Sequence, residues 1–295
     1  MIVIEGGLVD AHAHLSFEPH DVFGLPRGSR ELIQAGLAAH RERGELLVRD
    51  AGSLPGVSPE DLAPAIGCGP FLAPADHYLP HLYDPTEPRD AAARAAAQIR
   101  AGWPWAKVIL DFPEPGGSPL QPRLGYEPAV LREIADAVHE AGGRLAMHVM
   151  GEHVDLAIEA GADSIEHGNL ASPDAVRAMA ERGIAWVPTL ATVAERYLER
   201  VPPARPLLER QRVTLRLAGE LHVTVLAGTD EEPHGSVARE VAALVRYGLP
   251  PRAAILGASL GAYAFFGVEP SGQVTFDADP EDDVTALARP RTVTV

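Results

Sequence analysis

The chain has 295 residues, of which 46% are hydrophobic, and a formal net charge of −16. The length suits one α/β barrel with a large core, and the acidic charge argues against nucleic-acid binding. The single cysteine, Cys68, cannot form an internal disulfide. The sequence shows neither a signal peptide nor an apolar stretch of the ~20 residues that a membrane helix needs. We therefore expect a cytoplasmic protein with no membrane or nucleic-acid partner.

Eight short aliphatic segments predict strands that are buried on both faces. In chain order they are residues 8–14, 45–50, 69–73, 106–111, 144–149, 164–167, 184–190 and 224–230. Helical patterns occupy residues 29–43, 89–101, 127–141, 172–182 and 236–247, and a longer stretch over 191–221 is broken by prolines. Strands that alternate with helices over short connections predict parallel βα units. The expected fold is an α/β protein with a (β/α)8 barrel of the TIM type.

The C-terminal tail, residues 272–295, has no helical period and ends in alternating threonine and valine. This pattern predicts one or two strands outside the barrel, which can pair with Ile2-Val3-Ile4 at the other end of the chain. We therefore expect a single barrel domain over residues 1–295, with short extra strands from residues 1–7 and 272–295.

Ligand-type side chains recur in or at the ends of the predicted strands. His12 and His14 lie two residues apart on the first strand, so both imidazoles project to the same side. A barrel of this type has its active site at the carboxyl ends of its strands. Imidazole and carboxylate groups bind Zn²⁺, and other divalent metals accept the same ligands. The predicted metal ligands are His12, His14, Lys107, His148, His167 and Asp230.

A bound divalent ion lowers the pKa of its water toward ~7 and polarises a carbonyl oxygen, and two ions can divide these tasks. Asp230 is the expected catalytic residue, since it can accept the proton of that water and pass it to a leaving amine. An ammonium group among metal ions is disfavoured, so Lys107 is expected to be neutral and able to form a carbamate that bridges two ions. The alternatives are a single-metal site with Lys107 solvated or paired with Asp111.

Further polar residues lie in the predicted loops of the same face. His77, His153 and His234 are expected to contact substrate, although exposed loop histidines without a function are also common. Asp10 is expected either to orient a ligand histidine or to pair with a backbone amide or helix end. Specificity is expected to lie in residues 71–88, 112–128 and 230–235.

Taken together, these motifs resemble the amidohydrolase superfamily. The matching residues are Asp10-Ala11-His12-Ala13-His14, Lys107, His148, Ser164-Ile165-Glu166-His167-Gly168 and Gly228-Thr229-Asp230. Residues 160–168, followed by Val187-Pro188-Thr189-Leu190, are similar to the branch that contains imidazolonepropionases and metal-dependent prolidases. The resemblance extends from Leu8 to the C-terminus.

The resemblance implies a site with two metals. His12 and His14 would hold the more buried ion with Asp230, His148 and His167 would hold the second, and carbamylated Lys107 would bridge them. It also implies a small β-sandwich domain built from both termini, of which residues 1–7 and 272–295 would be a much reduced remnant. Glu152 lies four positions after His148, one further than deaminases of the superfamily require, and those deaminases lack the bridging lysine, which disfavours deamination.

The expected function is metal-dependent hydrolysis of a C–N bond by a metal-activated hydroxide. The substrate is expected to be a small molecule: an amide, a dipeptide, an N-acyl amino acid or a cyclic amide. The alternative reaction is hydrolysis of an ester, lactone or phosphotriester at the same centre, because bond choice depends on the loops. A non-catalytic binding protein fits the intact ligand set less well, and a homo-oligomer is compatible with the sequence.

Overall fold

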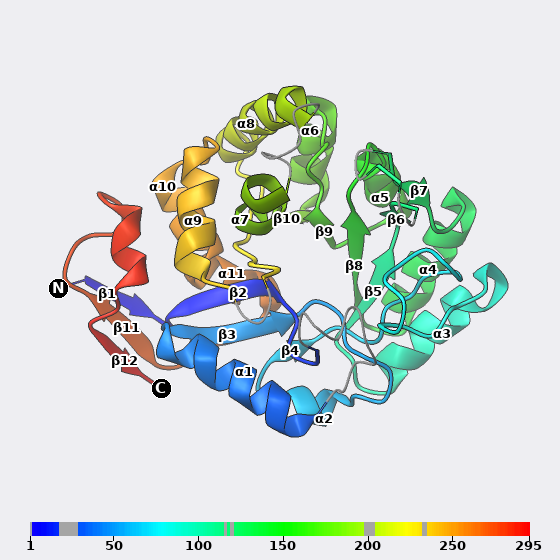
Figure 1. The fold of residues 1–295 in the computed structure, drawn as a ribbon, viewed down its shortest axis with the longest axis horizontal. Helices are drawn as coiled ribbons and strands as arrows, with labels where there is room; N and C mark the ends of the chain where they lie inside the picture. Colours follow the sequence, from blue (N-terminus) through cyan, green and yellow to red (C-terminus); the bar gives the residue numbers. More distant parts are fainter. Residues whose placement is uncertain (1, 18–28, 115–116, 119–120, 198–203, 232–234) are drawn as a thin grey trace.

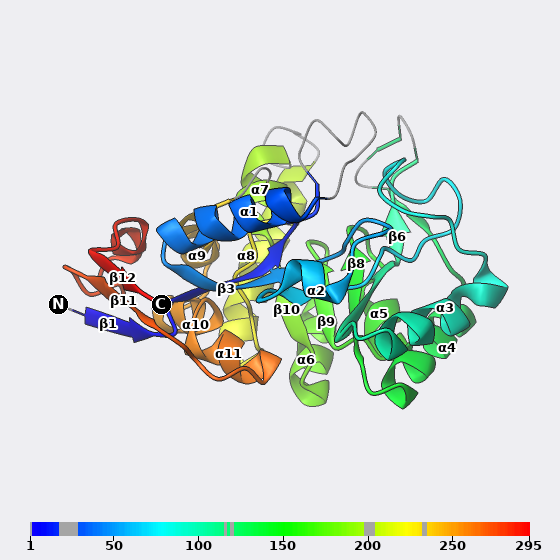
Figure 2. The same cartoon turned by 90° about the horizontal axis from the view of Figure 1, so that it is seen from below.

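The fold is described from a computed structural model that covers residues 2–17, 29–114, 117–118, 121–197, 204–231 and 235–295. Parallel strands form its centre and helices surround them (Figures 1 and 2). One sheet has the order β2 (Leu8–Ala13), β3 (Glu45–Asp50) and β4 (Ile66–Gly67). A second sheet has the order β10 (Ala185–Val187), β9 (Ser164–His167), β8 (Arg144–Val149) and β5 (Trp105–Ile109).

Backbone contacts connect these two sheets on both sides. Cys68, directly after β4, forms a parallel bridge to the first residue of β5. On the other side, Trp186 of β10 forms a bridge to Val225, and Ala11 N of β2 donates to Ala227 O at 2.8 Å. The backbone contacts therefore lead from β2 through both sheets and the segment around Val225 back to β2, as in a TIM-like barrel.

Three of the predicted strands differ from the observed ones. The third is a two-residue strand, β4, continued by isolated bridges. The seventh ends at Val187, because Pro188 has no N–H to donate and Thr189 has a left-handed φ of 50°. The eighth, predicted over residues 224–230, is not a regular strand: it has one β-bridge, at Val225, and separate backbone hydrogen bonds to β2 and β10. There the chain passes so close to β2 that a Cβ added at Gly228 would lie 2.5 Å from His12 Cβ.

Capping residues and prolines mark the ends of several helices. Ser29 Oγ accepts a hydrogen bond from Leu32 N at 3.1 Å, and Gly183 ends α6 with a left-handed φ of 67°. Proline occupies the first position of α3, α4 and α6. The helices are α1 (Arg30–Glu42), α2 (Pro59–Leu62), α3 (Pro88–Arg100), α4 (Pro128–Glu140), α5 (Val154–Ala160), α6 (Pro173–Arg182), α7 (Leu190–Thr192), the π-helix η2 (Val193–Tyr197), α8 (Arg205–Glu220), α9 (Val237–Arg246), α10 (Pro251–Gly257), α11 (Leu260–Phe266) and the 3₁₀-helix η5 (Val284–Ala288).

The main hydrophobic core lies between the strands and the surrounding helices. Alternate residues of β8, such as Leu145 and Met147, are buried in one cluster with apolar residues of α3 and α4. On three other strands, β3, β5 and β9, charged residues next to buried apolar positions lie inside the barrel: Arg49, Lys107 and Glu166 are at most 1% exposed. The barrel therefore buries a charged layer, and that layer supports the candidate site.

The two chain ends form a separate antiparallel sheet of β1 (Ile2–Glu5), β11 (Gln273–Phe276) and β12 (Thr292–Thr294). Ile2 pairs with Phe276, which confirms the predicted pairing of the terminal strands.

A short hairpin of β6 (Asp111–Phe112) and β7 (Arg123–Leu124) follows β5. Among the helices of the described residues, none combines the length and the apolar character needed to cross a bilayer.

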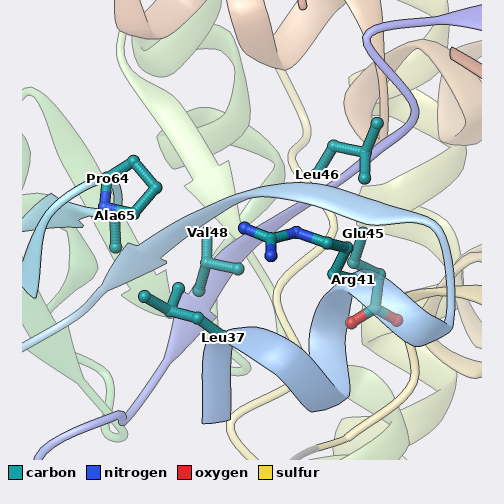
Figure 3. Close-up of a pocket in the computed structure, with 7 residues that line it drawn as sticks. All are labelled: Leu37, Arg41, Glu45, Leu46, Val48, Pro64 and Ala65. Carbon is teal, nitrogen blue, oxygen red and sulfur yellow. The ribbon is translucent and has the colours of Figure 1, made fainter. Parts of the chain in front are cut away.

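A small cavity of about 20 Å³ lies between α1 and β3, outside the barrel (Figure 3). The Arg41 guanidinium reaches toward Val48 across this space. The lining residues are Leu37, Arg41, Glu45, Leu46, Val48, Pro64 and Ala65. None of the predicted site residues lines this cavity, so it is not where the predicted chemistry would occur.

Candidate metal centre

Three of the predicted ligands converge at the carboxyl ends of the first and last barrel segments. Asp230 Oδ1 lies 3.4 Å from His12 Nε2 and 3.3 Å from His14 Nε2. Ligand atoms ~2.0–2.1 Å from one tetrahedral ion lie about 3.3–3.4 Å from each other. Asp230 Oδ1 is therefore spaced from each of the two nitrogens as two ligands of one cation are spaced, and ligand atoms of His12, His167 and Asp230 all lie within 4.8 Å of one another.

A second pair of imidazoles adjoins this group. His148 Nδ1 and His167 Nε2 are 3.0 Å apart, and the His167 ring centroid is 5.1 Å from that of His12. Asp230 faces this pair too, since its Oδ2 lies 3.9 Å from His167 Nδ1. Two nitrogen lone pairs at this separation repel each other, so a proton or a cation must lie between them.

Hydrogen bonds fix the tautomer of three of the four imidazoles. In each, Nδ1 faces an oxygen that accepts its proton, which leaves the Nε2 lone pair toward the centre. The acceptors are Glu166 Oε2 for His12 at 2.6 Å, the Gly52 carbonyl for His14 at 3.3 Å and Thr189 Oγ1 for His167 at 2.7 Å. Thr189 Oγ1 itself donates to Pro188 O, so it can only accept from His167. In all three rings Nε2 is therefore the nitrogen that faces the centre.

The charge states also suit a divalent cation. Burial, together with the neighbouring His167, holds the pKa of His148 well below its usual range, and burial lowers the pKa of His167 to about 3. For Asp230, burial raises the pKa, but His12 and His14 outweigh it and hold the pKa well below the usual range. At neutral pH the centre therefore presents the neutral imidazoles of His148 and His167 and the Asp230 carboxylate.

Lys107 lies beside the centre and is 1% exposed. Among the described residues its Nζ has no hydrogen-bond partner, and burial lowers its pKa. The alternative pairing with Asp111 is not observed, because that carboxylate accepts from Met150 N, Gly151 N and His153 Nδ1. Burial also contradicts a solvated lysine. Lys107 is therefore a buried amine without a hydrogen-bond partner in the part of the chain that the structure describes.

The composition singles out the same residue. Of the 25 lysines and arginines in the chain, Lys107 is the one lysine, and all the others are arginine. A guanidinium keeps its proton in proteins, whereas an amine can lose it and act as a nucleophile. This contrast could have identified Lys107 from the sequence without any strand assignment.

A charged pair inside the barrel supports the centre, and reasoning from the sequence missed it. Glu166 accepts from His12 through Oε2, and its Oε1 accepts from Arg49 Nη2 at 2.6 Å. Burial raises the pKa of Glu166, but Arg49, Lys107 and His12 outweigh it and hold the pKa well below its usual range. The Arg49 guanidinium also lies over the Trp105 ring, 5.0 Å from its centroid. Opposite charges on two fully buried strands are the signal that could have revealed this pair.

Asp10 supports the backbone around the ligands. Its Oδ1 accepts from His12 N at 3.0 Å and Thr229 N at 3.1 Å, and its Oδ2 accepts from Thr229 Oγ1 at 2.7 Å. The carboxylate therefore joins β2 to the segment that carries Asp230. Its hydrogen bonds within the described residues go to backbone amides and a hydroxyl, and its Oδ2 also lies 3.9 Å from His40 Nδ1, which is not one of the predicted ligands.

The structure describes two of the three histidines that are predicted to contact substrate. His77 bonds to the carbonyl of Ala75 in its own loop at 2.8 Å, and His153 bonds to Asp111 at 2.7 Å with 29% of its side chain exposed. Within the described residues, neither lies within hydrogen-bonding distance of the ligand-type side chains. His234 lies outside the described residues.

Backbone strain coincides with the centre. His167, Thr189 and Asp230 have left-handed φ values of 65°, 50° and 46°. Such values are uncommon for residues other than glycine and cluster at functional sites. Each of the three follows or ends one of the last three barrel segments, so the strain accompanies the turn that directs His167 and Asp230 inward.

Known proteins resemble more than half of this chain, and one family matches nearly all of it. The Amidohydrolase family matches residues 3–279. An uncharacterized protein of Mycobacterium tuberculosis is 34% identical over 281 residues, covering 88% of this chain and 74% of that protein. Ochratoxinase of Aspergillus niger is 26% identical over 193 residues, covering 57% of this chain and 40% of that protein.

Solved structures agree in fold. The crystal structure of the A. niger ochratoxinase has a TM-score of 0.80 at 20% identity, covering 99% of this chain and 80% of that one. A Xaa-Pro dipeptidase with bound methionine has a TM-score of 0.75 at 22% identity, covering 99% of this chain and 84% of that one. At these identities the likeness concerns the TIM-like barrel alone. With the family match, the resemblance found in the sequence is confirmed: the chain belongs to the Amidohydrolase family and is a hydrolase that acts on carbon–nitrogen bonds.

Proposed function

We propose that this protein hydrolyses the C–N bond of a small amide, a dipeptide, an N-acyl amino acid or a cyclic amide, with one or two divalent cations, Zn²⁺ first among them. The observation that carries the proposal is the spacing of Asp230 Oδ1 from His12 Nε2 and His14 Nε2, 3.4 and 3.3 Å, which suits a shared cation. His148 and His167 would hold the second ion.

A carboxylated Lys107 would bridge the two cations. The support is its buried Nζ without a hydrogen-bond partner among the described residues, together with the lowered pKa, which favours the free amine. A free amine adds to carbon dioxide: the new N–C bond forms as one N–H proton is released. The product is an anion with two oxygens, which suits a position between two cations.

When bound here, a divalent cation lowers the pKa of a water molecule and polarises the carbonyl oxygen of a substrate. Asp230 would accept a proton from that water and deliver it to the amine nitrogen as the C–N bond breaks. Its position favours this role, because its two oxygens face different imidazole pairs and 22% of its side chain is exposed. Glu166 and Thr189 hold the His12 and His167 rings in the orientation that leaves Nε2 available.

The names of similar proteins are consistent with this reaction class. One is a Xaa-Pro dipeptidase, which points to dipeptides, and another is an ochratoxinase. From these names we infer only the kind of bond that this protein cleaves, because the loops around the centre decide the substrate.

The test measures the metal content of the purified protein and its turnover on panels of dipeptides, N-acyl amino acids and cyclic amides. Asp230→Asn is expected to lower kcat on a substrate so identified by about 10²–10⁴-fold. Asp136→Asn, at an exposed position of α4, is the control and should keep wild-type turnover. Full turnover by Asp230→Asn, or a protein that binds no divalent metal, would contradict the proposal.

A further inference from the structure

Four aromatic side chains form a continuous series at the carboxyl ends of the strands, which we call the aromatic arc: Phe17, Phe71, Tyr78 and Phe112. Neighbouring ring centroids are 6.4 Å apart for Phe17 and Phe71, 4.9 Å for Phe71 and Tyr78, and 5.1 Å for Tyr78 and Phe112. These are the separations of tilted and edge-to-face aromatic pairs. The four residues follow the first, third and fourth barrel segments, so they cover one side of the barrel mouth.

The aromatic arc ends on the candidate metal ligands. At one end, Phe17 stacks on His14, with centroids 4.9 Å apart and an interplanar angle of 27°. At the other end, Tyr78 and Phe112 lie 5.8 and 5.7 Å from the His148 ring. The apolar surface is therefore continuous with the centre rather than a separate patch.

Two rings of the arc are buried in the protein, and the other two are partly exposed. Phe17 and Phe71 are 2% and 0% exposed, whereas Tyr78 and Phe112 are half-buried. Phe71 packs so closely on Gly52 that a Cβ added there would lie 2.1 Å from Phe71 Cε1. Accessible aromatic surface thus lies in the same mouth as the partly exposed Asp230 carboxylate.

The carboxylates near the centre and the arc are already engaged. Glu231 follows Asp230 directly and pairs with Arg239 Nη1 at 3.0 Å. On the arc side, the nearest carboxylate in sequence, Asp111, is buried and already accepts three hydrogen bonds. The charged groups beside the arc, Glu114 and Arg123, pair with each other at 3.4 Å, so a molecule at the centre would meet the aromatic rings on this side.

We propose that the aromatic arc is a subsite for a flat apolar group, above all an aryl ring, attached next to the scissile C–N bond. Aromatic rings offer such a group both apolar burial and favourable edge-to-face contacts. The inference rests on the proposed metal-dependent hydrolysis and narrows its substrates to amides that carry an aryl or similar planar group beside the reacting carbonyl or nitrogen.

The test uses two probes with the same metal-chelating group. Acetohydroxamate and benzohydroxamate differ only in a methyl or a phenyl substituent, and their affinities for the zinc-loaded protein are measured by calorimetry. Wild type is expected to bind benzohydroxamate at least about tenfold more tightly. Tyr78→Ala and Phe112→Ala should each reduce this preference to about threefold or less, with acetohydroxamate affinity unchanged.

Phe265→Ala is the matched control, because it removes another half-buried phenyl ring, next to Trp105 at the start of β5. It should keep the full preference. If an alanine variant no longer binds acetohydroxamate, the leucine variant at the same position is used instead, because it keeps a large apolar side chain. Its affinities for benzohydroxamate and acetohydroxamate then give the preference. Equal affinity of wild type for the two probes, or an undiminished preference in both arc variants, overturns the subsite. Failure of both probes to bind wild type would instead count against the metal centre itself.

Discussion

His12 Nδ1 lies 2.6 Å from Glu166 Oε2, and both side chains are almost completely buried. The carboxylate orients the ring and makes its Nε2 a stronger ligand. Glu166→Gln keeps an acceptor of the same shape but removes the charge, so it should weaken Zn²⁺ binding by about 10–100-fold. Competition with a chromogenic chelator measures this affinity. Glu159→Gln, at an exposed position of α5, is the control, and wild-type affinity in Glu166→Gln would show that the ring needs no carboxylate.

Arg49 compensates the buried charge of Glu166. Arg49→Met leaves that carboxylate without its cation and should lower the free energy of unfolding of the metal-free protein by about 3–5 kcal/mol. Adding Glu166→Gln removes the uncompensated charge, so the double variant should be more stable than Arg49→Met alone. Urea denaturation followed by circular dichroism compares the variants.

An exposed ion pair provides the control for that comparison. Arg177 lies 2.9 Å from Asp174 on α6, with both side chains more than half exposed. Arg177→Met should leave the unfolding free energy nearly unchanged. If Arg49→Met behaved the same way, Arg49 would have no role in balancing Glu166.

Lys107 offers a clean chemical test because no other side chain in the protein is an amine of this kind. Metal reconstitution with carbon-13 bicarbonate should give a carbamate resonance that Lys107→Met lacks. The same variant should bind one equivalent of metal fewer than wild type, as measured by elemental analysis. A carbamate signal that persists in Lys107→Met would come from the α-amino group and would remove the support for a bridging lysine.

The pair of His153 and Asp111 predicts a pH dependence of stability. The hydrogen bond to Asp111 raises the pKa of His153 above 6.5, its usual value, in the folded state. The folded protein therefore holds this proton more tightly, and the resulting stabilisation is complete below about pH 6.5 and is lost as the pH rises through the folded pKa. The loss of Tm in His153→Gln should thus be larger at about pH 6 than at about pH 9. An equal loss at both values would indicate that packing, rather than charge, stabilises the pair.

The ligand-type residues could be predicted because their positions follow from local rules. His12 and His14 share a face since a strand has a period of two, and the carboxyl ends of parallel strands meet at one end of a barrel. Arg49 and Glu166 could not be paired in this way, because they are 117 residues apart and lie on strands that are not neighbours in either sheet. Their contact depends on the stagger of the strands, which no local pattern specifies.

The strand predicted over residues 224–230 shows the other limit. Its aliphatic sequence is typical of a buried strand, yet the close approach of Gly228 to His12 and the left-handed Asp230 replace regular pairing with a single bridge. Tertiary packing overrides propensity here. The departure occurs where the catalytic carboxylate is proposed, and residues near functional sites are where local rules are expected to fail.

Arg49 stacks over the Trp105 ring inside the barrel, beneath the candidate metal centre. Both side chains are at most 2% exposed, so they obstruct the route to the centre from the amino ends of the strands. Among the described residues, this leaves the opening at the opposite end, where the strands have their carboxyl ends, for ions, water and organic molecules. An occupant of that opening should delay the escape of the ions, and a tightly held inhibitor would protect the loaded enzyme from chelators.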